Sequence, residues 1–248
     1  MLHPQLRRIS IAASLLAYAC SIAAFEAPSP ISKVDVTAHL AAMRPSSAHK
    51  PARVPPAVLW LKPIHSNTVD PSTPGSFTLL QKNKMFSPHL LVVPVGSSVA
   101  FPNADPFFHN VFSLFDGRRF DLGLYEAGST RSVVFSREGV SYIFCNIHSE
   151  MSAVVISLAT QSYSIADQQG VFHIRDVPGG DYELHIWVEG QRQTALDRMT
   201  RRVHVAEASA GQAVDLGEIE TDHADPSNLS RHLNKFGRPY EPDANPIY

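Results

Sequence analysis

The amino-acid sequence predicts an all-β protein made of two β modules. Short runs of apolar and β-branched residues recur along the chain with Gly, Pro, Asn and Asp between them, which is the pattern of a β-sandwich or barrel. Apolar residues make up 44% of the 248 residues and charged residues 18%, so the chain can bury a sizeable core. This length allows one large domain or two smaller ones.

The amino terminus predicts export. Residues 1–24 carry Arg7 and Arg8 and then an apolar run that ends in small residues, which is the layout of a secretory signal peptide. The run is shorter than the roughly 20 apolar residues that span a bilayer, and no later segment approaches that length. We therefore expect a periplasmic or secreted protein with no membrane span.

The region after the signal is rich in Pro, Ala and Ser. Residues 25–56 are predicted to be a linker or lead-in, with one strand near Val34–His39. The first β module is predicted over residues 57–160, with no helix. Its expected strands are Ala57–Lys62, Phe77–Gln81, Leu90–Val95, Ser98–Phe101, Ser129–Phe135, Val140–Cys145 and Ala153–Leu158.

A second and smaller β-sandwich is predicted over residues 161–221. About sixty residues are marginal for an independent domain, so this module is expected to pack on the first. Residues 222–248 are polar and Pro-containing, and we expect an extended tail. The strands expected in the second module are Val171–Ile174, Tyr182–Val188, Arg202–Ala206 and Ala213–Ile219.

Composition excludes one class of partner. The formal net charge is −2, and removal of the signal peptide would make it more negative because the two arginines are lost. A mildly acidic chain lacks the basic footprint of nucleic-acid binding.

The most specific pattern is a set of candidate metal ligands. Cys145, His148 and Met151 follow one another at a spacing of three residues, and His109 lies upstream. Two imidazoles, one thiolate and a weak axial thioether are the ligands of a blue-copper electron-transfer site. Taken singly, each of these residues is more often a packing residue, and the ordered set is what indicates copper. Because Cys20 lies in the signal, the exported chain has one thiol, and metal ligation protects a lone thiol in an oxidising compartment.

The expected strands place these ligands together. The strand before Cys145 would deliver the thiol at its end, and a short turn would bring His148 and Met151 to the same point. His109 would arrive from a separate strand-end loop, and the amide of Asn110 would brace the ligand loop or donate toward the Cys145 sulfur. The side chains expected to keep water from the metal are Phe107, Phe108, Phe112, Phe144 and Ile147.

These residues resemble a known family, the cupredoxins, the type 1 blue-copper proteins that include amicyanin and plastocyanin. The resemblance covers about residues 57–158 and is carried by the short Cys-x2-His-x2-Met spacing, by His109-Asn110-Val111 and by the stretch Phe86–Asp105. It implies a Greek-key β-sandwich that binds one type 1 copper ion through His109, Cys145, His148 and Met151.

The second module is similar to the carboxypeptidase-regulatory or transthyretin-like β-sandwich, through Asp167–Gly170 and Val177–Leu184. The two modules together resemble secreted bacterial proteins described as methylamine-utilisation or plastocyanin-like. The resemblance thus covers both halves of the exported chain.

The expected function is a periplasmic one-electron carrier. A complete protein ligand set leaves no open position for substrate, so enzyme activity is not expected, and the chain has no second His cluster for another copper site. His148 is the expected electron port, and Glu150 beside it would favour a basic or mixed-charge redox partner, such as a c-type cytochrome or a periplasmic dehydrogenase. The alternative is a protein that holds or delivers copper, or binds a surface partner through its second sandwich, without a redox role.

Overall fold

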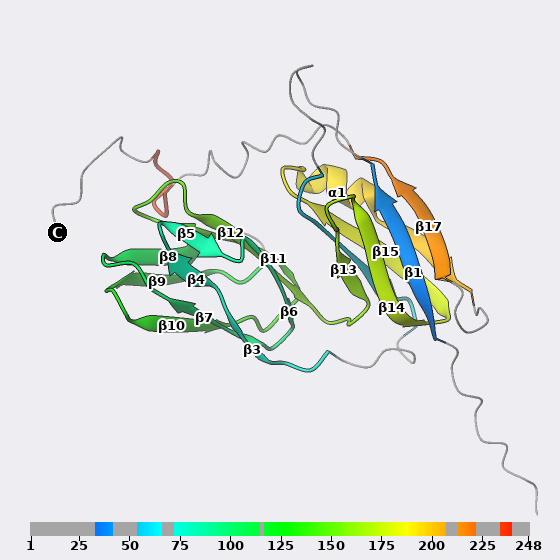
Figure 1. Ribbon diagram of the computed structural model, residues 1–248, viewed down its shortest axis with the longest axis horizontal. Helices are drawn as coiled ribbons and strands as arrows, with labels where there is room; N and C mark the ends of the chain where they lie inside the picture. The colour runs from blue at the N-terminus through cyan, green and yellow to red at the C-terminus, as the bar shows by residue number, and fades with distance from the viewer. Residues whose placement is uncertain are drawn as a thin grey trace, which may run out of the picture. The chain divides into compact units, whose positions relative to one another are not determined.

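A computed structural model describes residues 33–41, 54–65, 72–114, 117–206, 213–221 and 234–239 (Figure 1). The predicted all-β class is confirmed, because strands dominate these segments and the helix α1 (Gln193–Met199) is short. The predicted signal peptide and most of the predicted tail lie outside the described residues. No described helix is long and apolar enough to cross a membrane.

The first sandwich carries the candidate ligands. One sheet has five strands in the order β6 (Leu90–Pro94), β12 (Ser152–Leu158), β11 (Gly139–Cys145), β8 (His109–Ser113) and β9 (Phe120–Tyr125). The other has three, in the order β10 (Thr130–Val134), β7 (Ser98–Pro102) and β3 (Ser76–Thr78), and a hairpin joins β4 (Leu80–Lys82) to β5 (Met85–Ser87). Buried side chains of both sheets, including Phe101, Val111, Ile143 and Val155, form one apolar core.

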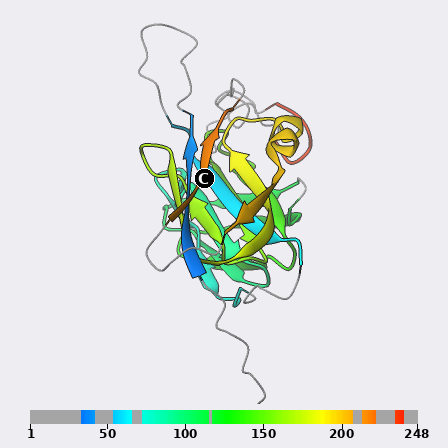
Figure 2. The same ribbon diagram turned by 90° about the vertical axis from the view of Figure 1, so that its right-hand side faces the viewer.

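The second sandwich also has two sheets. The first has the order β14 (Val171–Pro178), β1 (Lys33–Leu40) and β17 (Ala213–Ile219), and the second β13 (Tyr163–Ile165), β2 (Ala57–Pro63), β15 (Gly180–Val188) and β16 (Arg201–Val205). The blue strand β1 lies beside the orange strand β17 in both views, and the two run parallel (Figure 2).

The pairing of β1 and β2 differs from expectation. From the sequence, a strand near Val34–His39 is expected in a lead-in, and Ala57–Lys62 is expected to be the first strand of the first β module. In the structure β1 pairs with β14 and β17, and β2 pairs with β13 and β15. The second sandwich is therefore discontinuous in sequence, with β3 to β12 inserted between its parts. The physical reason is that the alternating burial along β1 is compatible with any half-buried sheet, and the local sequence does not specify which strand β1 pairs with.

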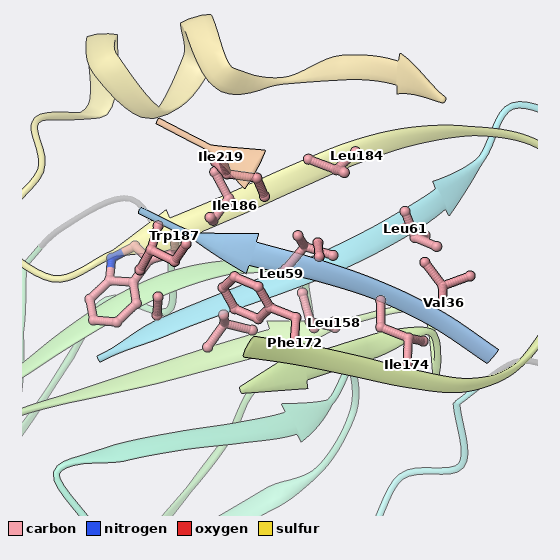
Figure 3. Close-up of a cluster of buried hydrophobic side chains, with 14 of the residues drawn as sticks. Val36, Leu59, Leu61, Leu158, Phe172, Ile174, Leu184, Ile186, Trp187 and Ile219 are labelled. Atoms are coloured by element: carbon pink, nitrogen blue, oxygen red, sulfur yellow. The ribbon is translucent and has the colours of Figure 1, made fainter. Parts of the chain in front are cut away.

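Strand β12 connects the two cores. It is buried on both faces, because Val154, Ile156 and Leu158 belong to the core of the second sandwich while Ala153 and Val155 belong to the core of the first. Figure 3 shows Leu158 among side chains of the second sandwich, which include Leu59, Phe172, Leu184 and Trp187. Burial on both faces explains the nearly unbroken apolar sequence of this strand.

Several elements were not predicted. β8, β9, β5, β13 and α1 have no counterpart among the expected strands, and the expected run Phe77–Gln81 is divided between β3 and β4. All five residues of β8 are buried, so its sequence lacks the period-two alternation by which half-buried strands are recognised.

Candidate metal site

The register of the first sandwich brings His109 and Cys145 to one end of the same sheet. β8 and β11 are antiparallel neighbours, with Cys145 opposite Val111 and Phe144 opposite Phe112. His109 opens β8 and Cys145 closes β11, so the beginning of one strand meets the end of the other. Both residues are fully buried.

The loop after Cys145 brings His148 to the same place. The amide of Met151 donates to the carbonyl of His148 over 3.1 Å, and the amide of Cys145 donates to the carbonyl of Met151 over 3.2 Å. These two bonds fold the loop into a tight turn between β11 and β12. The amide of Asn146 donates to the carbonyl of Asn110 over 3.2 Å, which ties the loop to β8.

Three side chains converge as metal ligands would. The Cys145 Sγ atom lies 3.7 Å from Nδ1 of His109 and 3.6 Å from Nδ1 of His148, and the three ligand atoms all lie within 4.8 Å of one another. Metal–sulfur and metal–nitrogen bonds of about 2.3 and about 2.0 Å that meet at an angle near 110–115° separate S and N by roughly 3.5–3.7 Å. The two S···N separations, 3.7 and 3.6 Å, fall within about this range.

The ring orientation of His109 is fixed from behind by a carboxylate. Its Nε2 atom lies 2.9 Å from Oδ2 of Asp105, and the Asp105 side chain is only 5% exposed. Assigning the Nε2 proton to this bond leaves the Nδ1 lone pair directed toward Cys145. Asp105 is itself held by the amides of Asn83 and Lys84, at 2.6 and 3.0 Å.

The Cys145 sulfur lies in a set of backbone donors. Burial raises the pKa of the thiol, and hydrogen bonds from the amides of Asn110, Ile147 and His148 act in the opposite direction. Such donors stabilise the thiolate form of the cysteine when a bound cation has displaced the thiol proton. The backbone amide of Asn110 is thus one of the donors to the sulfur, and the role expected for Asn110 beside the metal stays a prediction.

The Asn110 side chain points to a different partner. Its Nδ2 donates to Oδ1 of Asp121 over 2.7 Å, while its buried Oδ1 atom has no partner within the described residues. Asn110 thus joins β8 to β9 through its side chain and to the ligand loop through its backbone.

His148 is the candidate ligand nearest to the surface. It is partly exposed, whereas His109 and Cys145 are fully buried. Burial, together with the nearby His109 and Lys84, lowers the pKa of His148 to about 4. The ring is therefore neutral near pH 7 and has a lone pair to offer a metal.

Apolar contacts surround the two imidazoles. The ring centroid of Phe107 lies 5.3 Å from that of His109 and 5.5 Å from that of His148, and the Lys84 ammonium lies over the Phe107 ring, 5.6 Å from its centroid. Of the other expected shielding residues, Ile147 packs against the core and Phe108 is 38% exposed.

Met151 is fully buried and belongs to the same apolar cluster as Cys145. The loop therefore places it on the inner side of the site. Its role as fourth ligand stays a prediction, as do the roles assigned to the other three residues.

The chain is similar to several solved structures over about a third of its length. No protein-family model and no curated protein matches the chain. Among solved structures, it is similar to a purple cupredoxin from Nitrosopumilus maritimus, at 25% identity over 33% of this chain and 98% of that one, with a TM-score of 0.30. It is also similar to the copper-containing nitrite reductase of Thermus scotoductus SA-01, at 22% identity over 39% of this chain and 25% of that one, with a TM-score of 0.32.

A third similar structure is an amicyanin variant in its Cu(I) form, at 17% identity over 34% of this chain and 82% of that one, with a TM-score of 0.32. These neighbours are copper proteins by name, and the similarity extends over about a third of the chain. At such TM-scores the functional conclusion has to come from the site itself. The resemblance of the second sandwich to carboxypeptidase-regulatory modules stays a prediction.

Sequence reasoning missed Asp105 as a partner of His109. A carboxylate four residues before a candidate histidine ligand was the available signal, because metal-bound histidines commonly donate their second ring N–H to a carboxylate. The sequence analysis also gave no role to Asp121, whose contact with Asn110 depends on the pairing of β8 with β9.

Proposed function

We propose that the protein binds one type 1 copper ion through His109, Cys145 and His148, with Met151 as the weak fourth ligand, and carries single electrons between redox proteins. The observation that supports this most is the separation of 3.7 and 3.6 Å between the Cys145 sulfur and two imidazole nitrogens. A thiolate with two imidazoles in this arrangement is the donor set of blue-copper sites.

The chain contributes a rigid frame. Copper in this site would supply a one-electron couple. Cys145 is held by three backbone amides and His109 by Asp105, and both ligands are excluded from water. The positions of ligands held in this way would change little between the two oxidation states of copper. The reorganisation energy would then be small, which supports fast electron exchange.

His148 is the proposed route for electrons. Its ring is partly exposed while the other ligand ring is buried, so its edge offers the shortest path from the site to a docked protein. The rim carries both signs of charge, from Lys84 and from the exposed Glu150. A small, transient contact there would suit a mixed-charge partner such as a c-type cytochrome or a periplasmic dehydrogenase. This role requires export through the predicted signal in residues 1–24.

A carrier is favoured over an enzyme. Within the described residues, His109, Cys145 and His148 form the one group of histidine, cysteine and acidic side chains close enough to hold a metal. A multicopper oxidase or a copper nitrite reductase needs a second copper centre where substrate binds. With its own ligands complete, the proposed site exchanges electrons and offers substrate no open position.

The test is the visible spectrum of the purified protein after addition of Cu(II) and then of ascorbate. We expect an intense thiolate-to-Cu(II) charge-transfer band that bleaches on reduction, one copper per chain, and loss of the band in Cys145→Ser and His148→Ala. The matched control is His204→Ala, since His204 bonds Asp181 at 2.7 Å on the surface of the second sandwich. A band of equal intensity in Cys145→Ser would refute the ligand assignment.

The alternative of copper delivery has a separate readout. A delivery protein should release Cu(I) to a chelator within the time of mixing, whereas a carrier should retain copper in both oxidation states. The burial of Cys145 and His109 favours retention. Rapid loss of Cu(I) from the unmodified protein would favour the alternative.

A further inference from the structure

The described part of the C-terminal region, residues 234–239, contains a closed turn. The amide of Asn234 donates to the carbonyl of Arg238 over 2.8 Å, and the amide of Gly237 donates back to the carbonyl of Asn234 over 2.9 Å. The Asn234 side chain accepts from the amides of Phe236 and Arg238 at 2.9 and 3.1 Å. We call Asn234–Arg238 the C-terminal clip.

The clip contacts the candidate metal site at two points. The amide of Lys235 donates to Oδ1 of Asn146 over 2.9 Å, and Asn146 directly follows Cys145. The Lys235 ammonium donates to Oδ2 of Asp121 over 2.8 Å, and this side chain is only 23% exposed. One residue far along the chain thus holds both the ligand loop and strand β9.

These contacts close a ring of hydrogen bonds beside the thiol. The carboxylate of Asp121 accepts a hydrogen bond from the side chain of Asn110. The carbonyl of Asn110 accepts from the amide of Asn146. The side-chain oxygen of Asn146 in turn accepts from the amide of Lys235. Asn110 also donates its amide to the Cys145 sulfur. The ring therefore includes a residue that contacts the sulfur and the residue that begins the ligand loop.

We propose that Lys235 is a positioning residue for the metal site, which fixes the ligand loop against β8 and sets the donor geometry at Cys145. This proposal rests on the proposed function for its effect on copper, but the restraint on the loop exists without metal. Lys235 contacts no ligand and acts through Asn146 and through the Asp121–Asn110 pair.

The first experiment uses the metal-free full-length protein. In Lys235→Ala we expect the amides of Asn146 and Asn110 to exchange with deuterium about five- to tenfold faster, because the ring that closes the loop has lost its ammonium group and with it the ion pair to Asp121. Lys235→Arg can still donate to Asp121 and should stay within about twofold of the unmodified protein.

The matched control is Lys62→Ala. Lys62 also donates to a carboxylate over 2.8 Å, that of Glu138, and is similarly part-exposed, but it lies on β2 away from the ligand loop. The control should leave exchange at Asn146 and Asn110 unchanged. Equal acceleration in both alanine variants, or none in Lys235→Ala, would overturn the proposal.

The second experiment uses the copper-loaded protein. Lys235→Ala should shift the charge-transfer band and the reduction potential, while Lys235→Arg and Lys62→Ala should leave both at their original values. An unmodified protein without a charge-transfer band, but with faster exchange in Lys235→Ala, would refute the copper function and leave the positioning role standing. A band and potential unaltered in Lys235→Ala would show that the clip does not set the donor geometry.

Discussion

At the scale of single residues, the Asp105–His109 pair decides which imidazole nitrogen faces the thiol. In Asp105→Asn the new amide group can donate to Nε2 of His109, which would move the ring proton to Nδ1, the atom that lies 3.7 Å from the sulfur. We expect copper affinity to fall by about 10- to 100-fold in a chelator competition, as for other partners of metal-bound histidines.

The control for this change is Asp181→Asn, which alters an Asp–His pair at the surface, between Asp181 and His204. Its copper affinity should equal that of the unmodified protein. Unchanged affinity in Asp105→Asn would mean that the tautomer of His109 is set by something other than the carboxylate.

The buried histidines also predict how the metal-free protein responds to acid. Burial lowers the pKa of His148 to about 4, and burial likewise lowers that of His109 below 6.5. Histidines with depressed pKa values bind protons more readily in the unfolded chain, so the free energy of unfolding falls as pH drops from about 6.5 toward 4.

Below this interval two carboxylates act in the same direction. Burial opposes the ionised forms of Asp121 and Glu138, but hydrogen bonds, first of all from Lys235 and Lys62, lower both pKa values overall. Their stabilising effect is present above the ordinary values of 3.8 and 4.5 and is lost as pH falls through the lowered values. Urea midpoints that stay constant from about pH 7 to about pH 4 would contradict the prediction.

Much of the site could be predicted from the sequence because its ligands are close in the chain. Cys145, His148 and Met151 lie in one loop, so their convergence depends on a single turn, and the structure brings Cys145 and His148 together with His109. Asp105 and Lys235 could not be predicted in the same way. Their contacts depend on strand register and on a long-range approach of the chain, for which no local pattern exists.

At the scale of elements, β12 offers a test of which core supports the metal site. Val154 and Val155 are adjacent and fully buried, but Val154 faces the second sandwich and Val155 faces the core that contains Cys145 and Met151. Truncation of either to alanine should cost about 1–3 kcal/mol of unfolding free energy.

The effect on copper should differ between the two. Val155→Ala leaves a cavity in the ligand-side core and should shift the charge-transfer band, whereas Val154→Ala should leave the band in place, so each variant serves as the control for the other. Equal band shifts would show that the two faces of β12 are not independent.

Element prediction from the sequence succeeded where burial alternates or where turns bound the run. Ala213–Ile219 was predicted with the bounds that β17 has, and Val140–Cys145 and Ala153–Leu158 with bounds one residue shorter than β11 and β12. The unalternating β8 was missed, and so was α1, whose seven residues are too few to show helical periodicity.

At the scale of the whole molecule, the shared strand β12 predicts cooperative unfolding. Side chains from β12 and β6 complete the core of the second sandwich, and the indole of Trp187 on β15 donates to the hydroxyl of Tyr142 on β11 over 3.2 Å. Loss of either sandwich would expose an apolar face of the other.

We therefore expect one thermal transition. The loss of the charge-transfer band and the loss of β circular dichroism should coincide in temperature within about 2 °C, as two-state unfolding requires. Leu61→Ala, which changes only the second sandwich, should lower both midpoints together. A band that survives after the circular dichroism transition would mean that the sandwiches unfold separately.

The whole-molecule arrangement was the least predictable from sequence. Residues 57–160 and 161–221 were predicted as consecutive modules, and those boundaries stay predictions. The strand pairing joins β1 and β2, from the beginning of the described chain, to β13 through β17 in the second sandwich. Parallel pairing of β1 with β17 joins segments that share no turn, so no sequence signal connects them.

The position of β1 has a consequence for biogenesis. A chain that is made or exported from its amino terminus presents β1 first, while its neighbours β14 and β17 begin only at Val171 and Ala213. Until those arrive, an amphipathic strand with two open edges is a template for wrong pairing with other chains. The sandwich that holds the candidate ligands can complete its own strand pairs in the meantime, while β1 stays unpaired until β14 and β17 have been made. A chaperone that shields residues 33–40 would act during this interval, before the last strand closes the sheet.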